Sequence, residues 1–334
     1  MNDTKRFLLQ VALAPVNGSR FQPTGFPDIG AATFQRPKAG TDEGWEQCLL
    51  LESAQSMANR LEAVGWDAHE NRPVDALAGL PYVRVVKEGQ FLTASRLEAH
   101  RLASPYIKEA LDADGRPFGE HLKERLSLTE GQPDDLRTIA QALFRIDPLS
   151  LVHGVFFAEK SWPTQPKVTR ALMAEIEAAD VREAVSGGVK KDHVSPRSSE
   201  GAGSREGFGM VPFHRTEWTA RSIVASFVID RAQLRSFGLS EPATDLLDTI
   251  ARWEIRSLVD EPMRLRTACD LERLDDGDLV DRSGEVLPSR ADLEAELRTA
   301  IDACRDELGD GEPIELVWSP AKRKKGKAES SEEA

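Results

Sequence analysis

The chain has 334 residues, 40% of them hydrophobic, and a formal net charge of −13. That length can bury a substantial core in one large or two modest domains, and no apolar run approaches the ~20 residues that a membrane span needs. The negative charge gathers in residues 240–312, which hold 9 basic and 21 acidic side chains. The rest of the chain is nearly neutral, and a nucleic-acid surface needs local rather than average positive charge. The composition therefore does not exclude a nucleic-acid partner, and the acidic block is either solvated surface or a partner-facing region.

At the N-terminus, Lys5 and Arg6 precede the apolar run Phe7–Ala14, as they would in a secretory signal peptide. The run is short, contains Gln10 and alternates in polarity, which is the period of a β-strand. The three cysteines are odd in number and far apart, which suits neither a disulfide framework nor a zinc site. We therefore expect a cytoplasmic protein with no membrane contact and no metal or other cofactor.

Apolar periodicity and turn residues predict strands and helices that interleave irregularly along the chain. In chain order these are a strand at 7–16, a loop at 21–40, a strand at 48–51, a helix at 53–64, a strand at 82–86, helices at 116–128 and 134–144, a strand at 149–158, a helix at 170–179, a long loop or hairpin at 187–209, a strand at 218–229, a helix at 243–259, a strand at 263–271, a helix at 290–307 and a strand at 314–318. Residues 321–334 form a charged tail without an apolar anchor, which predicts disorder. The irregular order of the elements predicts an α+β fold.

The predicted helix at 53–64 has one apolar side and one polar side. The polar side carries Gln55, Ser56 and Asn59, with Ser53 and Arg60 at its margin. Ser53 is a good N-cap, and a helix N-terminus offers unpaired N–H groups and a partial positive charge to a phosphate. The spacing alone leaves two interpretations open: a phosphate-binding site, and an ordinary amphipathic helix with a solvated polar face.

The stretch Gly187–Arg221 combines glycines with a local positive balance. It holds six basic and four acidic side chains, and its two histidines add weak donors. Basic groups would meet phosphates, and the glycines allow close backbone approach. Phe208 lies between glycines and is the best candidate for a side chain that wedges between bases, whereas Phe213 and Trp218 are expected to pack in the core.

Two segments together carry a family resemblance. The segment FQPTGFPDIG at 21–30, followed by LLESAQSMANRLE at 50–62, resembles the backbone subunit of type I-U (I-G) CRISPR effector complexes, a Cas-seven-type protein of the RAMP superfamily. Further blocks that resemble this subunit lie in the same order at 100–106, 207–220 and 264–272. The resemblance therefore extends from about residue 7 to residue 272.

The resemblance implies a ferredoxin-like, RRM-type palm with long insertions, including a thumb-like β-hairpin at about 187–217, within a single domain over residues 1–320. It also implies that several copies stack along one CRISPR RNA in a Cascade complex for antiviral defence. The implied partners are CRISPR RNA, target DNA through the guide, further copies of the chain, the large subunit and the fused repeat-processing subunit.

The residues that we predict to contact RNA lie on the matched helix, in or beside the matched blocks, and on the basic stretch. They are Arg20, Gln22, Ser53, Gln55, Ser56, Asn59, Arg60, Arg101, Lys190, Lys191, His193, Arg197, Phe208, His214, Arg215 and Arg221. Asn59 stands where relatives carry lysine, which removes one charge. Glu52, directly before the helix, is unfavourable next to RNA and is expected to pair with a neighbouring arginine instead.

No sequence motif predicts catalysis. The six histidines form no paired metal-ligand motif, and there is no P-loop, CxxC or Gly-x-Ser-x-Gly. The run Asp275–Asp278 resembles a calcium-loop fragment, but Leu287 stands where such a loop needs glutamate, so an acidic turn is the better interpretation. We predict no catalytic residue. The alternative is a metal-dependent endoribonuclease that uses Asp28 or a histidine such as His214. Asp28 is a candidate because related type III subunits cut target RNA with a loop aspartate.

Overall fold

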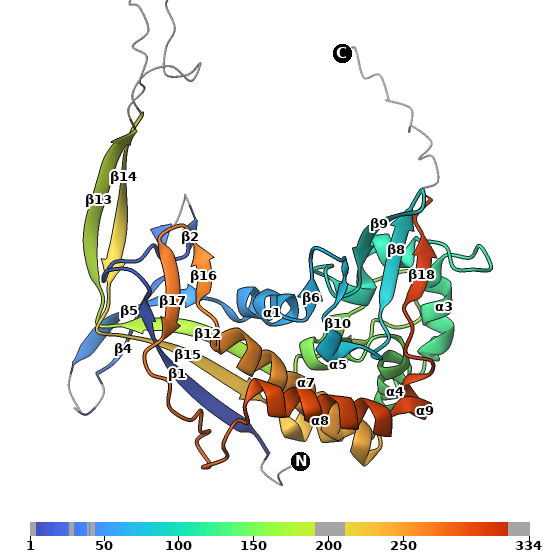
Figure 1. The fold of residues 1–334 in the computed structure, drawn as a ribbon. Helices are drawn as coiled ribbons and strands as arrows, with labels where there is room; N and C mark the ends of the chain where they lie inside the picture. The colour runs from blue at the N-terminus through green and yellow to red at the C-terminus, as the bar shows by residue number, and fades with distance from the viewer. Residues whose placement is uncertain (1–4, 27–29, 39, 41–43, 191–210, 320–334) are drawn as a thin grey trace, which may run out of the picture.

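The computed structural model describes residues 5–26, 30–38, 40, 44–190 and 211–319. Within these residues, the centre of the protein is an antiparallel sheet in the order β16-β17-β1-β15-β12-β5-β4 (Figure 1). Its strands are β1 (Phe7–Pro15), β4 (Thr33–Pro37), β5 (Trp45–Glu52), β12 (Leu172–Ala179), β15 (Ser222–Ile229), β16 (Met263–Arg266) and β17 (Cys269–Arg273).

Four of these strands and two helices form a ferredoxin-like unit. The chain runs from β1 through α1 (Ala54–Ala63) to β12, turns back along β15, and passes through α7 (Glu241–Val259) to β17. The spatial order β17-β1-β15-β12 is therefore fourth, first, third, second, with both crossovers made by a helix. The predicted α+β class and ferredoxin-like palm are confirmed.

The palm forms because its strands alternate. In β1 the side chains of Phe7, Leu9, Val11 and Leu13 are buried, and in β15 every second residue from Ile223 is buried. The helices α1 and α7 pack on β12 and β15 and on each other, so one face of the sheet carries the core.

A β-hairpin interrupts the connection between β12 and β15. Its strands, β13 (Arg182–Lys190) and β14 (Val211–Thr219), pair from Arg182↔Thr219 to Lys190↔Val211. Figure 1 shows the hairpin extending away from the palm as a two-stranded ribbon. The predicted thumb-like hairpin is confirmed, and its paired strands begin at residue 182 rather than 187.

A second lobe lies at the other end of α1. Its sheet consists of β18 (Ile314–Val317), β8 (Val83–Lys87) and β9 (Gln90–Ala94). The hairpin and this sheet rise on the same side of the molecule, with α1 between them (Figure 1). The remaining elements are β2 (Gly25–Phe26), β3 (Gly30–Ala31), β6 (Trp66–Asp67), β7 (Arg72–Pro73), η1 (Asp75–Leu77), η2 (Arg101–Ala103), α2 (Pro105–Lys108), α3 (Phe118–Arg125), α4 (Leu136–Ile146), α5 (Leu149–His153), β10 (Val155–Phe156), β11 (Lys167–Val168), α6 (Arg231–Ser236), α8 (Arg290–Ala303) and α9 (Arg305–Leu308). Across the described ranges, no helix is both long and apolar enough to cross a membrane.

Two predicted elements were of the wrong type. Residues 170–179, predicted as a helix, contain strand β12, in which Leu172, Ala174, Ile176 and Ala178 are buried at a period of two. Alanine, methionine, leucine and glutamate favour helices, but pairing with β15 and β5 overrides that propensity. Residues 149–158, predicted as a strand, form α5 and then β10, because a short buried apolar run does not by itself distinguish the two states.

Other predictions placed boundaries incorrectly. The stretch 263–271 is a hairpin, β16 and β17, that turns at Ala268 with φ +56°. The stretch 218–229 is divided between β14 and β15, and 290–307 is divided at Cys304 between α8 and α9. Strand β4 lies in a segment predicted as a loop.

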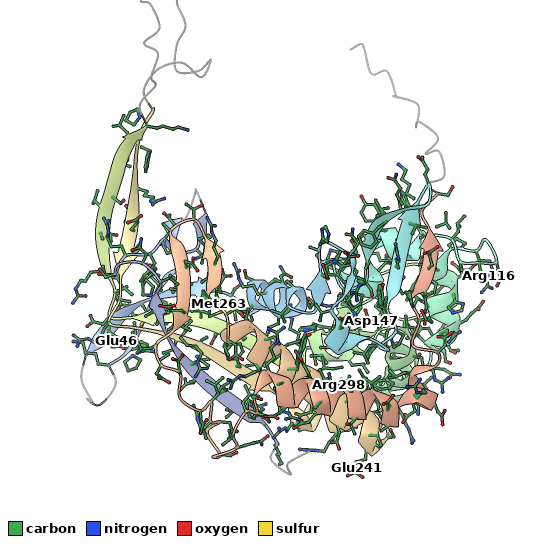
Figure 2. All side chains as sticks on the ribbon, in the orientation of Figure 1. Glu46, Arg116, Asp147, Glu241, Met263 and Arg298 are labelled. Carbon is green, nitrogen blue, oxygen red and sulfur yellow. The ribbon has the colours of Figure 1, made fainter. Side chains whose placement is uncertain are left out.

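A buried polar cluster joins α5, α7 and the second lobe. His153 Nε2 lies 2.9 Å from Glu254 Oε2, and neither side chain is exposed. Nearby, Ser95 donates to the buried Asp147 at 2.5 Å, which is labelled in Figure 2. Burial lowers the pKa of His153 from 6.5 to about 4 and raises the pKa of Glu254 well above 4.5. Burial therefore favours the neutral form of both side chains in the folded protein.

These shifts predict a pH effect for Glu254→Gln. As pH falls from 6.5 to 4.5, the unfolded chain takes up a proton on His153 that the folded protein does not, and this lowers the free energy of unfolding by up to about 3 kcal/mol. In wild type, Glu254 opposes this loss, because its raised pKa lets the folded protein take up a proton on Glu254 before the unfolded chain does. The variant lacks this opposing effect, so we expect its free energy of unfolding to fall more steeply with decreasing pH than that of wild type. Urea unfolding at pH 6.5, 5.5 and 4.5 measures the difference, and parallel curves for the two proteins would contradict the prediction.

Candidate nucleic-acid interface

The polar face of α1 lies open between the hairpin and the second lobe. Ser53 caps the helix by accepting a hydrogen bond from the Ser56 backbone N–H at 3.3 Å, as predicted. Met57, Ala58 and Leu61 are buried, and the side chains of Gln55 and Asn59 are exposed. The exposed amides of Gln55 and Asn59 can donate to phosphate oxygens.

Arg170, which sequence reasoning missed, joins this face. It lies in the loop before β12 and donates from Nη2 to Gln55 Oε1 at 2.6 Å and from Nη1 to the Ala54 carbonyl at 3.1 Å. The helix start therefore carries a half-buried cation from a segment 115 residues away. Only the pairing of β12 with β5 brings the two segments together, so no local pattern could have indicated it.

Glu52 pairs with arginines, as the sequence predicted. Arg60 Nη2 and Arg266 Nη2 both donate to Glu52 Oε1, at 3.0 and 2.5 Å, and the glutamate is 2% exposed. Arg60 also donates to the carbonyls of Arg264 and Leu265. Its guanidinium therefore ties α1 to β16, and a phosphate contact by Arg60 stays a prediction.

Arg101 was predicted to contact RNA, and the structure contradicts this. The side chain is 8% exposed, and all three of its nitrogens are occupied. Nε and Nη2 donate to the two carboxylate oxygens of Glu62 at 2.6 Å each, and Nη1 donates to the Gly154 carbonyl at 3.2 Å. Arg101 therefore neutralises a buried carboxylate at the back of α1 instead of facing solvent.

A groove of about 940 Å³ opens where the hairpin meets the palm. Gln22, His214 and Arg215, all predicted RNA contacts, line it together with residues of β2 and β3. Phe21 and Trp218 hold the two segments together by reciprocal backbone hydrogen bonds of 2.9 Å. The Phe21–Gly30 block and the basic stretch, separate in sequence, therefore form one surface.

Two predicted cations, Arg215 of the groove and Arg20, share a buried carboxylate. Arg215 donates from Nε to Glu217 Oε1 at 2.7 Å, and its Nη2 also lies 2.7 Å from that oxygen. Arg20 Nε lies 3.6 Å from Glu217 Oε2, and its side chain is 54% exposed. One glutamate thus orients two arginines and leaves the group with an excess positive charge.

A similar arrangement occurs where the hairpin leaves the palm. Arg221 Nε donates to Asp180 Oδ2 at 2.8 Å, and Arg182 Nη1 lies 3.2 Å from Asp180 Oδ1. The hydrogen bond from Arg221 lowers the pKa of Asp180. Both arginines stay largely exposed, so they can meet a polyanion while paired.

The two faces of the hairpin differ. One face presents Val185 and Val189, which are 81% and 52% exposed. The other carries exposed Lys190 and the ring of Phe213, which lies over Gly188. Trp218 is buried as predicted, whereas Phe213 is half-exposed and not a core residue, because it lies beyond the palm edge. Phe213, which was expected to pack in the core, is therefore a candidate for stacking on an RNA base.

Several predictions fall on residues that the structure does not describe. The predicted RNA contacts among them are Lys191, His193, Arg197 and Phe208, and Asp28 of the endoribonuclease alternative also lies outside the described residues. Within the described part of the chain, no group of three His, Cys, Asp or Glu side chains is arranged to hold a metal ion.

The palm, the inserted hairpin and the polar helix have the architecture that the motifs implied for a RAMP-superfamily protein. The chain belongs to the family of CRISPR-associated protein GSU0053, whose family model matches residues 7–183. The resemblance to type I-U (I-G) backbone subunits is thereby confirmed at the level of the family. Among solved structures, a chain of "CRISPR RNA-guided surveillance complex, pre-nicking" is similar at 12% identity and a TM-score of 0.36, covering 79% of this chain and 72% of that chain. No curated protein matches the sequence.

The burial of Arg101 yields a stability prediction. In Arg101→Ala, the Glu62 carboxylate loses its bidentate partner inside the protein, so we expect the free energy of unfolding to fall by about 3–5 kcal/mol. Chemical denaturation measures the change. The matched control is Arg116→Ala, an exposed arginine far from the hairpin (Figure 2), which should change stability by less than about 0.5 kcal/mol. An Arg101→Ala protein of unchanged stability that binds RNA less tightly would restore the original assignment.

Proposed function

We propose that the chain is the CRISPR RNA-binding backbone subunit of a type I-U (I-G) Cascade complex and that it displays the guide for pairing with target DNA in antiviral defence. The observation that carries the proposal is the convergence of Gln22, His214 and Arg215 on one groove at the base of the hairpin. These residues come from two matched blocks that are almost two hundred positions apart.

The chemistry of this surface suits a guide carrier. Exposed arginines such as Arg20 and Arg221 recognise phosphates irrespective of sequence, and each is already oriented by a carboxylate. Base pairing supplies the specificity in such a system, so the subunit needs to hold only the RNA backbone and expose the bases. Lys190 and Phe213 lie on one face of the hairpin, which offers a cation and an aromatic ring to the RNA.

The proposal extends to assembly. Several copies stack along one guide, next to the large subunit and the fused repeat-processing subunit, in the cytoplasm. The subunit acts without catalysis of its own. The endoribonuclease alternative depends on Asp28 or a histidine such as His214, and we do not extend the proposal to RNA cleavage.

Co-purification tests this function. The chain is expressed with its operon partners and a CRISPR array, and the purified complex is treated with ribonuclease. We expect protected RNA of guide length, and no such RNA when the array is omitted. Assembled protein that carries no RNA in the presence of the array would refute the proposal.

Lys190→Gln provides a residue-level test. Loss of one phosphate contact to a single strand should weaken RNA binding and reduce the slope of log affinity against log salt by about 0.7. The control is Lys123→Gln, which removes the same charge from α3, at the end of the molecule opposite the hairpin (Figure 1). Fluorescence-anisotropy titrations at several salt concentrations give both slopes. If both variants keep the wild-type slope, Lys190 is a solvated surface residue.

A further inference from the structure

A second pocket, of about 410 Å³, lies outside the groove at the hairpin base. It is bounded by the C-terminal ends of α1 and α7, the first residues of β16 and the N-terminal residue of α8. Arg60, Arg264 and Arg290 line it, and Glu261 is the acidic side chain among the described residues of its wall. Three arginines from three separate elements therefore surround one small space.

The charges of these arginines are unequally compensated. Arg60 shares Glu52 with Arg266, and Arg290 Nε lies 3.1 Å from Glu294 Oε1 at the surface. The exposed side chain of Arg264 has neither an ion pair nor a hydrogen-bond partner among the residues that the structure describes. The pocket therefore has a positive excess, with one cation free to meet a ligand.

Two polar atoms around the pocket are buried without a partner. Ser257 is 5% exposed, and its hydroxyl makes no hydrogen bond within the described structure. The Nε–H group of Arg60 is also buried and unpaired. A buried unsatisfied donor costs about 1–3 kcal/mol. Both atoms are covered by protein, so an acceptor in the pocket relieves this cost only when the side chains around them move.

We propose that this pocket binds a phosphate group. Guanidinium groups match tetrahedral oxyanions in charge and hydrogen-bond geometry, and a hydroxyl donor completes such a site. The carboxylate of Glu261 and the partial negative charges at the ends of α1 and α7 oppose an anion. Each helix end contributes only about half a charge. Glu52 and Glu294 offset much of the charge of Arg60 and Arg290, so the uncompensated Arg264 and the directed hydrogen bonds of the guanidinium groups favour the anion.

The position of the pocket relates it to the candidate RNA surface. Ser53, Ser56 and Arg60 follow one another at three- and four-residue spacing, so they lie along one stripe of α1 that leads to the pocket. A backbone phosphate of bound RNA is therefore one source of the ligand, and this assignment rests on the proposed function. A free phosphate or a nucleotide phosphate is the other source.

The first test uses inorganic phosphate and the full chain expressed without an array. Wild-type protein should broaden the phosphorus NMR signal of phosphate in a saturable manner. Arg264→Gln and Arg290→Gln should each weaken the affinity about tenfold, because a charged hydrogen bond is lost, and Ser257→Ala should weaken it at unchanged charge. Glu261→Gln should strengthen it. Arg116→Gln, which removes an equal charge elsewhere, should leave it unchanged.

The second test distinguishes the two sources. In the assembled complex, the double variant Arg264→Gln/Arg290→Gln should reduce the salt slope of RNA binding by about 1.4 if RNA supplies the phosphate. Weakened phosphate binding with an unchanged slope assigns the pocket to a free phosphate or a nucleotide. If wild type binds no phosphate and the slope is also unchanged, the pocket is not a phosphate site. A complex without any RNA would overturn the proposed function but not the phosphate site, because the titration with inorganic phosphate tests the pocket independently.

Discussion

The buried carboxylate of Glu52 is the interaction on which the candidate surface depends. It lies at the last residue of β5, and it accepts from Arg60 of α1 and from Arg266 of β16. Arg266 also donates to the carbonyls of Leu51 and Gln22. One carboxylate and two arginines therefore fix the helix, the sheet edge and the loop after Phe21 relative to each other. Because an uncompensated buried charge is costly, this clamp allows little variation in geometry.

Part of the acidity of residues 240–312 is internal to the fold. Asp248 of α7 is buried and accepts from Arg231 and Arg252, and Glu285 accepts from the same Arg231. These carboxylates neutralise arginines within the protein and add little to the potential at α1. The net charge therefore describes the RNA-facing side poorly, as expected when charges pair locally.

The sequence was sufficient where local physics determines the structure. Short sequence patterns predicted the alternation in β1, the Ser53 cap and the glycine-rich hairpin region. The order of strands and helices along the chain then agreed with the palm. It was insufficient where pairing across long distances decides. Leu172–Ala179 has helix-forming residues but lies between two strands, and Arg101 differs from an exposed arginine only because Glu62 faces it across 39 positions. Such partners are properties of the folded chain, which no local window contains.

The hairpin is a ribbon of two strands, and no third strand flanks it among the described residues. Two-stranded ribbons are marginally stable on their own in water, because each strand forms backbone hydrogen bonds along only one of its edges and buries little apolar surface. The exposed Val185 and Val189 sit on such a ribbon. A partner surface that covers this ribbon would therefore supply the apolar burial that the ribbon lacks alone, and it would reduce the conformational freedom of the two strands.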